Sequence, residues 1–437
     1  MRSPQVVDLL KPLIKLMTSA FFLMQKIISF FASYEEVCYM LMSFSVIILS
    51  GLLFGGFCKK LQFPSLFGMI IAGIVIGPNV LNLIDTSILS VSSEIRRMAL
   101  IVILIRAGLK LELSDLKKVG RSAILMCFLP ACFEILGMIL VAPKVFGISY
   151  LDAVIMGAVI GAVSPAVIVP RMIKLIDSGY GVDKGIPQMI LAGASVDDVF
   201  VIVMFTTFTS VAKGGGVSLM RFVDIPLSIV FGIIMGFVVG WLITKWFRSF
   251  EINQMVQVLI ILSVCFVLSF IENRIKVIPF ASLIAIMCVG IPIRKNDRNL
   301  AASLSGVYDK IWTVAEIFLF VLVGASVSIS SVSSAGVRVI ILIMCVLLFR
   351  MLGVFVCLIG TKLNFKEKVF CMIAYTPKAT VQAAIGGLPL AMGLSCGQIV
   401  LTVSVIAILF TAPLGAFGID ITYRRFLSGD REEMCKG

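Results

Sequence analysis

Two adjacent carboxylates, Asp197 and Asp198, lie in the middle of the apolar stretch 187–211. A charge at the centre of a bilayer costs roughly 2.5–3.5 kcal/mol, so ionisable residues at such a depth are expected to have a function. Neighbouring carboxylates repel each other and lose their protons in coupled steps. Because hard cations take oxygen ligands, we predict that H⁺ and Na⁺ or Li⁺ compete at Asp197 and Asp198. The alternative is that both carboxylates only pair with buried basic residues.

Two more charged residues, Glu134 and Arg350, lie inside apolar stretches 216 residues apart. We expect them to form a buried ion pair. Arginine stays protonated at any working pH, so Arg350 is a poor proton carrier, which favours one proton per cation. Lys378, directly after Pro377, is predicted to offset the negative carbonyl ends of a broken helix. The alternative for Lys378 is that it extends to a cavity.

The composition of the chain indicates which class of protein positions these residues. Of 437 residues, 60% are hydrophobic and 14% are charged, against roughly 25% charged in soluble domains. We therefore predict an all-α polytopic membrane protein, with membrane lipid as a partner and no nucleic acid or soluble partner. The chain has no histidine, which removes the commonest proton carrier and metal ligand. No cofactor and no catalytic residue are expected.

Thirteen apolar segments have about the length of a transmembrane helix. They are 38–57, 65–83, 97–112, 122–142, 151–171, 187–211, 222–244, 255–271, 278–293, 311–329, 337–360, 368–391 and 397–418. Lysine and arginine gather in alternate loops and in the C-terminal tail, which predicts a cytoplasmic C-terminus. A further segment at 12–32 would bring the basic N-terminus to the same side, so fourteen spans are favoured over thirteen. The alternative is an amphipathic helix on the membrane surface.

The chain repeats itself at an offset of about 214 residues. FPSLFGMIIAGIVIGP (63–78) resembles IPFASLIAIMCVGIPI (278–293), and AVSPAV (162–167) resembles AYTPKAT (374–380). Inverted repeats of this kind are typical of secondary transporters. The predicted organisation is an N-terminal segment 1–37, a first repeat 38–211, a linker helix 222–244, a second repeat 255–418 and a cytoplasmic tail 419–437.

Prolines interrupt one predicted helix in each repeat, at Ser164-Pro165 and at Thr376-Pro377. Proline removes a backbone hydrogen bond and clashes with the preceding turn, and a broken helix is tolerated in a bilayer where it lines a cavity. We expect two broken helices near the carboxylates, with Ser164 contributing to the ion site; the alternative is a pair of simple kinks. Counting from Thr376 as Asp197 follows Ser164 leads to Leu409, so one ion site per chain is predicted.

Several motifs together resemble the NHA subgroup of sodium/proton exchangers in the cation:proton antiporter superfamily. They are LIRAGL, GAVSPAVIVP, GYGVDKGIP, GASVDD, NFKEK and TPKATVQAAIG, and the resemblance runs from about residue 60 to 418. It implies the NhaA-like inverted-repeat fold, with a core of helices at about 122–211 and 337–418, two crossing broken helices, and a dimerisation domain formed by the other helices. It also implies a homodimer that works by elevator-like alternating access.

The resemblance assigns the cation-binding aspartates to Asp197 and Asp198, the crossover to Ser164-Pro165, and the core charge pair to Glu134 and Arg350. Some relatives carry lysine at the position of Arg350 and are electrogenic, so arginine resembles the electroneutral branch.

The expected protein is a multi-pass transporter, not an enzyme, in a cell or organelle membrane, exchanging Na⁺ (or Li⁺) for H⁺ one for one. One alternative is a sodium-coupled organic-solute symporter of the same fold. A less favoured alternative is an intramembrane aspartyl protease. That enzyme needs aspartates on facing helices and a GxGD motif, whereas here the carboxylates are adjacent on one helix and project about 100° apart.

Overall fold

The computed structural model describes residues 39–61, 63–110, 120–213, 219–274, 281–327 and 329–428. The chain divides into one unit of residues 1–45 and a second of residues 46–437, and the description below concerns the second. The N-terminal segment 1–37, with its predicted span at 12–32, lies outside the described residues.

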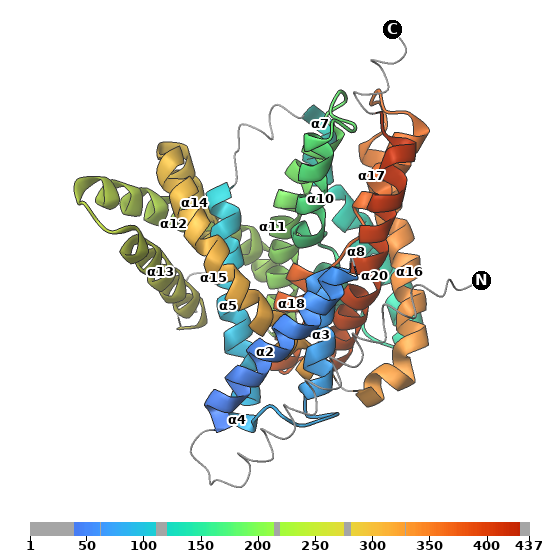
Figure 1. Ribbon diagram of the computed structural model, residues 1–437, viewed down its shortest axis with the longest axis horizontal. Coiled ribbons are helices and arrows are strands. Elements are labelled where there is room, and N and C mark those ends of the chain that lie inside the picture. Colours follow the sequence, from blue (N-terminus) through green and yellow to red (C-terminus); the bar gives the residue numbers. More distant parts are fainter. Residues whose placement is uncertain are drawn as a thin grey trace. The chain divides into compact units, whose positions relative to one another are not determined.

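The described residues form α-helices joined by loops (Figure 1). The helices are α2 (Tyr39–Lys60), α3 (Ser65–Ile76), α4 (Thr86–Ser90), α5 (Ser92–Lys110), α7 (Gly120–Met126), α8 (Leu129–Phe146), α9 (Tyr150–Ile160), α10 (Pro165–Asp177), α11 (Ile186–Lys213), α12 (Leu219–Ser249), α13 (Gln254–Arg274), α14 (Ser282–Asn296), α15 (Arg298–Ala325), α16 (Ile329–Cys357), α17 (Phe365–Ala374), α18 (Thr380–Ile385), α19 (Leu388–Ala391) and α20 (Gly397–Phe426).

Eight helical runs in the described part are long and apolar enough to cross a membrane. Two of them each combine two helices, α7 with α8 and α9 with α10. The other predicted spans coincide with helices that are shorter, such as α3 and α14, or carry more charges, such as α5 and α15. The total of thirteen or fourteen spans therefore stays a prediction.

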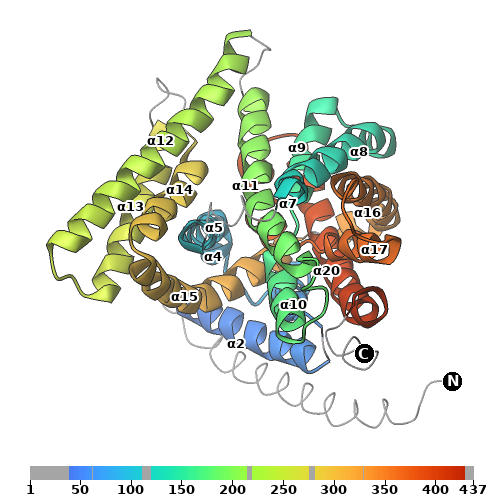
Figure 2. The same ribbon diagram turned by 90° about the horizontal axis from the view of Figure 1, so that it is seen from above.

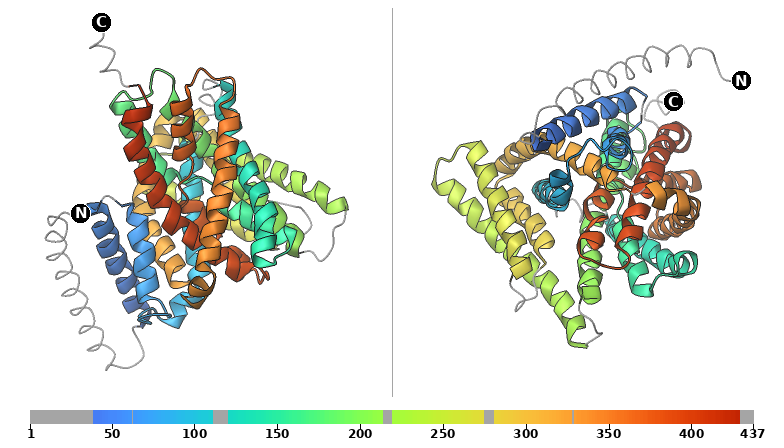
Figure 3. Two further views of the ribbon diagram at one scale, coloured as in Figure 1. Left: turned by 90° about the vertical axis from the view of Figure 1, so that its right-hand side faces the viewer. Right: turned by 90° about the horizontal axis from the view of Figure 1, so that it is seen from below.

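The helices pack as two groups, seen from above in Figure 2 and from below in Figure 3. In the first group α3, α5, α12, α13, α14 and α15 pack against one another. In the second, α8 packs on α9 and α16, and α11, α17 and α20 complete the packing around them. Contacts between the groups include those of α5 with α18 and of α3 with α20. The second group coincides with the predicted core segments.

Two close helix contacts relate the halves of the chain. In the contact of α3 with α15, a Cβ on Gly73 or on Gly324 would overlap backbone atoms of the partner helix. In the contact of α5 with α14, the same holds for Gly108 and Gly290. At the offset of the predicted repeat, Gly73 corresponds to Gly290 and Gly108 to Gly324. Each half therefore packs its glycine-bearing helices on the other half in the same way, which supports the two-repeat interpretation.

One helix in each half is interrupted close to the predicted position. Residues 161–164 are non-helical between α9 and α10, and Pro165 is the first residue of α10, where its missing N–H and restricted φ are favourable. Residues 376–379 are non-helical between α17 and α18. We call these two stretches the first and the second unwound segment. Both leave backbone N–H and C=O groups available for contacts outside a helix.

The loop after α10 joins the two halves at the end of the molecule where α20 ends. The Nζ atom of Lys184 lies 2.7 Å from Oε1 of the buried Glu367, and this hydrogen bond raises the pKa of Lys184. The backbone N–H of Gly181 donates to the carbonyl oxygen of Ser428 at 2.8 Å. Helix α20 continues to Phe426, so the boundary predicted at residue 419 was wrong: 419–426 extend the last helix, because its apolar positions still pack on the core, and residues 429–437 are not described.

Candidate functional site

The two unwound segments lie against each other. The backbone N–H of Ser164 donates to the carbonyl oxygen of Pro377 at 2.8 Å. The side chain of Gln382 bridges the same crossing, because its Oε1 accepts from the N–H of Ala379 at 2.8 Å while its Nε2 donates to the carbonyl oxygens of Ile160 and Ala162 at 3.0 and 2.8 Å. The crossing is therefore held by one backbone bond and by one fully buried amide.

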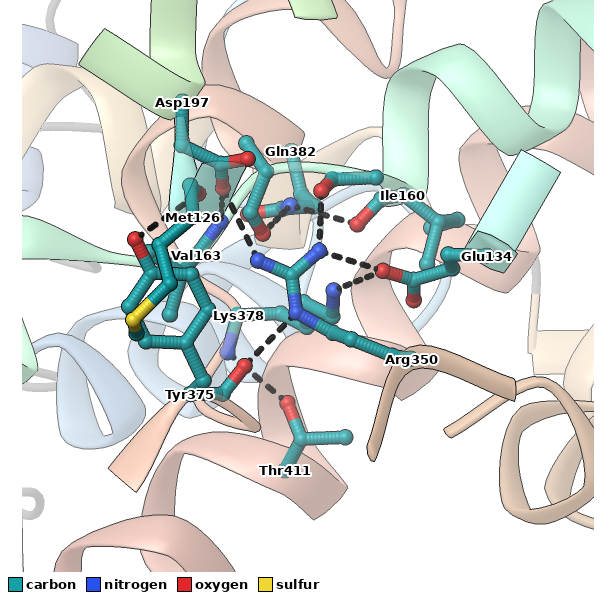
Figure 4. Close-up of polar contacts among 12 residues, drawn as sticks. Met126, Glu134, Ile160, Val163, Asp197, Arg350, Tyr375, Lys378, Gln382 and Thr411 are labelled. Carbon is teal, nitrogen blue, oxygen red and sulfur yellow. Dashed lines mark hydrogen bonds and ion pairs between the residues drawn. The ribbon is translucent and has the colours of Figure 1, made fainter. Parts of the chain in front are cut away.

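Arg350 of α16 lies between two carboxylates at this crossing (Figure 4). Its Nη1 donates to Oε2 of Glu134 at 2.7 Å and also to the carbonyl oxygen of Gly161. Its Nη2 donates to Oδ2 of Asp197 at 2.8 Å, and its Nε donates to the carbonyl oxygen of Tyr375 at 2.6 Å. The guanidinium is completely buried, so its fork of donors ties α8, α11 and both broken helices to one cation.

Two further bonds complete the charge network. The Nζ atom of Lys378 donates to Oε2 of Glu134 at 2.6 Å, and the N–H of Val163 in the first unwound segment donates to Oδ2 of Asp197 at 2.8 Å. The prediction that Lys378 offsets helix carbonyl ends was wrong: Glu134 holds its ammonium, because a buried charge is satisfied best by an opposite full charge. The prediction of a Glu134–Arg350 ion pair is confirmed.

The second half contains a counterpart of the Asp197 contact. The hydroxyl oxygen of Thr411 accepts from the N–H of Lys378 in the second unwound segment at 2.9 Å. Thr411 corresponds to Asp197 at the repeat offset of 214 residues, two positions beyond the Leu409 inferred from spacing. A hydroxyl therefore supports the second crossing strand where a carboxylate supports the first, and this half places no carboxylate at the equivalent position.

The charges of the network cancel. Glu134 and Asp197 carry two negative charges, and Arg350 and Lys378 carry two positive charges. Asp198 makes no ion pair with any residue that the structure describes, and its Oδ1 is buried without a hydrogen-bond partner. The alternative in which aspartate only pairs with a basic residue therefore holds for Asp197 and not for Asp198.

Other buried oxygens at the crossing also have no hydrogen-bond partner within the described part of the chain. They are Oδ1 of Asp197, Oγ of Ser164 and Oγ1 of Thr380. Together with Oδ1 of Asp198 they are carboxylate and hydroxyl oxygens, which are the donors that a hard cation takes. Buried polar atoms normally have partners, so this concentration at one crossing indicates a place for a ligand.

The remaining predicted site residues have structural positions. Pro165 begins α10, and Pro377 accepts the Ser164 bond. The hydroxyl of Thr376 donates to the carbonyl oxygen of Ile373 at 2.8 Å, which closes the end of α17. Sequence reasoning did not single out Gln382, Tyr375 or Thr411. The signal for Gln382 was its amide in an otherwise apolar stretch of the motif TPKATVQAAIG.

We expect Gln382→Glu to destabilise the crossing. The substitution removes both N–H donors and places a carboxylate oxygen against the carbonyls of Ile160 and Ala162. Each buried group left unsatisfied costs about 1–3 kcal/mol, so the midpoint of thermal unfolding in detergent should fall clearly. Gln398→Glu at an exposed position of α20 is the matched control. Equal midpoints for the two variants would contradict the bridging role.

Two broken helices that cross beside buried carboxylates, in an all-helical chain of two related halves, define a secondary active transporter. Comparison with known proteins specifies the class. The family described as sodium/hydrogen exchanger, transmembrane, matches residues 45–424. Sodium/hydrogen exchanger 9B2 of Homo sapiens is 32% identical over 377 residues, covering 83% of this chain and 70% of the relative. Sodium/hydrogen exchanger 9B1 of Homo sapiens is 31% identical over 384 residues, covering 84% and 73%.

Among solved structures, the sodium proton antiporter MjNhaP1 from Methanocaldococcus jannaschii at pH 8 matches with a TM-score of 0.77 at 19% identity, covering 89% of this chain and 99% of that one. The chain therefore belongs to the sodium/hydrogen exchanger family. It is a multi-pass integral membrane protein with the fold of the cation:proton antiporters, as predicted. It is a transporter and not an enzyme, which excludes the protease alternative.

Proposed function

We propose that this chain exchanges Na⁺ or Li⁺ for H⁺ across its membrane and that Asp198 is the group that binds the cation or the proton in turn. The observation that carries the proposal is the closed network of Glu134, Arg350, Asp197 and Lys378, which leaves Asp198 as the carboxylate at the crossing without a counter-ion. The unpartnered oxygens of Asp197, Ser164 and Thr380 supply further cation ligands.

The same network supports one-for-one exchange. With Asp198 protonated, the five groups carry no net charge. With Asp198 ionised and one Na⁺ bound, they again carry none. Both loaded forms are electrically equivalent, whereas an empty site with ionised Asp198 is a buried uncompensated charge, which is costly. The empty site therefore crosses the membrane slowly, and the cycle couples one cation to one proton without moving net charge.

The two helix groups support an elevator-like cycle. The group around α8, α11 and α16 holds all the site residues and would move as the transport core. The group of α3, α5 and α12 to α15 would stay fixed and form the dimerisation domain of a homodimer in the lipid bilayer. The basic residues at the end of α20, Arg424 and Arg425, favour a cytoplasmic C-terminus. The symporter alternative has no specific observation in its favour.

Purified protein in liposomes tests the proposal. With a pH dye in the lumen and a pH gradient in place, Na⁺, Li⁺ or K⁺ is added outside, with and without the potential clamped by K⁺ and valinomycin. We expect Na⁺ or Li⁺ to drive proton movement at a rate that does not change with the clamp. A wild-type protein that responds to none of the three cations would remove the exchange proposal, and a rate that depends on the clamp would remove the one-for-one stoichiometry.

A further inference from the structure

Arg350 can serve two carboxylates only if the plane of its guanidinium is held in one orientation. A guanidinium is flat, and its donors point in fixed directions. Here Nη1 must reach Glu134 while Nη2 reaches Asp197. A rotation of the plane would keep one of these bonds and lose the other. The closed charge network therefore depends on whatever fixes the guanidinium.

The residue in contact with that plane is Tyr375. The Cζ atom of Arg350 lies 5.3 Å from the centroid of the tyrosine ring, within the range of a cation–π contact. The carbonyl oxygen of the same residue accepts the Nε bond of Arg350 at 2.6 Å. Tyr375 thus contacts Arg350 with its ring and with its backbone, and it is fully buried.

The far edge of the Tyr375 ring is held as well. Its hydroxyl donates to the carbonyl oxygen of Met126 at the end of α7, at 3.2 Å. On α11 the hydroxyl faces Gly193, one helical turn before Asp197, and a Cβ at Gly193 would overlap it. The ring is therefore wedged between Arg350 and the backbone of the helix that carries both aspartates, and glycine provides the room.

We propose that Tyr375 is a positioning residue for ion exchange, which keeps Arg350 shared between Glu134 and Asp197 and so leaves Asp198 free for the transported ion; this rests on the exchange function proposed above. Tyr375 does not touch the ion. The ring does the positioning, and the hydroxyl places the ring. Loss of the ring lets Arg350 turn toward Asp198 or away from Asp197, and the site then binds Na⁺ less tightly.

The test compares Tyr375→Leu, which removes the ring, with Tyr375→Phe, which keeps it. In the liposome assay Tyr375→Leu should raise the half-saturating Na⁺ concentration about tenfold, in line with a buried cation–π contact, while Tyr375→Phe stays within about threefold of wild type. The maximal rate per folded molecule should change less than the half-saturating concentration. A role in folding alone would lower the amount of active protein and leave the half-saturating concentration unchanged.

The wedge is tested by rescue. Gly193→Ala should lower the thermal midpoint and weaken Na⁺ saturation, and the double substitution Gly193→Ala/Tyr375→Phe should recover part of both, because the hydroxyl that the new Cβ meets is gone. Gly306→Ala, where nothing lies within 4 Å of the added Cβ, is the control and should behave as wild type.

The outcomes separate the two proposals. If wild type exchanges Na⁺ and Tyr375→Leu saturates at the wild-type concentration, the positioning role is wrong and the exchange function stands. If Gly193→Ala is harmless, or is not improved by Tyr375→Phe, the wedge is wrong. If wild type moves none of Na⁺, Li⁺ or K⁺, the exchange function is wrong and the positioning role falls with it.

Discussion

Replacing Asp198 by asparagine should abolish Na⁺-driven proton movement while the protein stays folded. In wild type the bound cation replaces a proton on Asp198, and the site remains neutral. In Asp198→Asn a bound cation would be an uncompensated buried charge, which costs about 3 kcal/mol or more. That cost corresponds to a loss in affinity of about a hundredfold. The lumenal pH dye measures transport, and the rise in thermal midpoint on adding Na⁺ measures binding.

Comparison with Asp197→Asn gives this prediction its specificity. Asp197 accepts bonds from Arg350 and Val163, so Asp197→Asn should lose transport and also lower the thermal midpoint without Na⁺. Asp198→Asn removes a carboxylate that has no counter-ion, so its midpoint without Na⁺ should equal or exceed that of wild type. Asp177→Asn, at an exposed position at the end of α10, should leave both properties unchanged. An Asp198→Asn protein that still exchanges, or equal loss of stability in the two site variants, would contradict the division of roles.

Much of this site could be predicted because buried charges and prolines are costly in a bilayer. Asp197 and Asp198 were identified by the price of placing charge at mid-membrane depth, and the breaks near Pro165 and Pro377 by the missing N–H of proline. The pairing of Glu134 with Arg350 followed from their common offset in the repeat. Each of these inferences needs only one residue type and its depth or spacing.

The remaining features depend on directions in space that spacing does not carry. Adjacent residues of a helix point about 100° apart, so only the structure shows that Asp197 faces Arg350 while Asp198 does not. The partners of Gln382 are carbonyl groups 220 and 222 residues away in the chain. Lys378 could have been assigned to Glu134 only with the crossing in view. The end of α20 was placed too early because its last turns combine apolar and basic residues.

Arg350→Met should have the largest effect on stability of any substitution in the site. It leaves Glu134 with Lys378 alone and leaves Asp197 with a single backbone N–H, so the network gains an uncompensated negative charge. Removing one partner of a buried ion pair typically costs 3–5 kcal/mol. We expect most of the protein to be lost to aggregation on extraction, as measured by the folded fraction in size-exclusion chromatography. The double variant Arg350→Met/Glu134→Gln removes one charge of each sign and should recover a large part of the folded fraction.

Arg350→Lys should keep the fold and change the charge moved per cycle. A lysine ammonium lacks the planar fork of arginine, so it cannot serve Glu134, Asp197 and Tyr375 together. Unlike arginine, a buried lysine is able to release its proton, which adds a second exchangeable proton to the cycle. Two protons would then move against one Na⁺, and exchange should become sensitive to the valinomycin clamp. Arg171→Lys, in the partly exposed pair with Asp420, should remain insensitive to the clamp. If Arg350→Lys exchanges at a rate that ignores the potential, then arginine at this position is not the reason for one-for-one coupling, and the neutral sum of the four-residue network would have to be maintained by other groups.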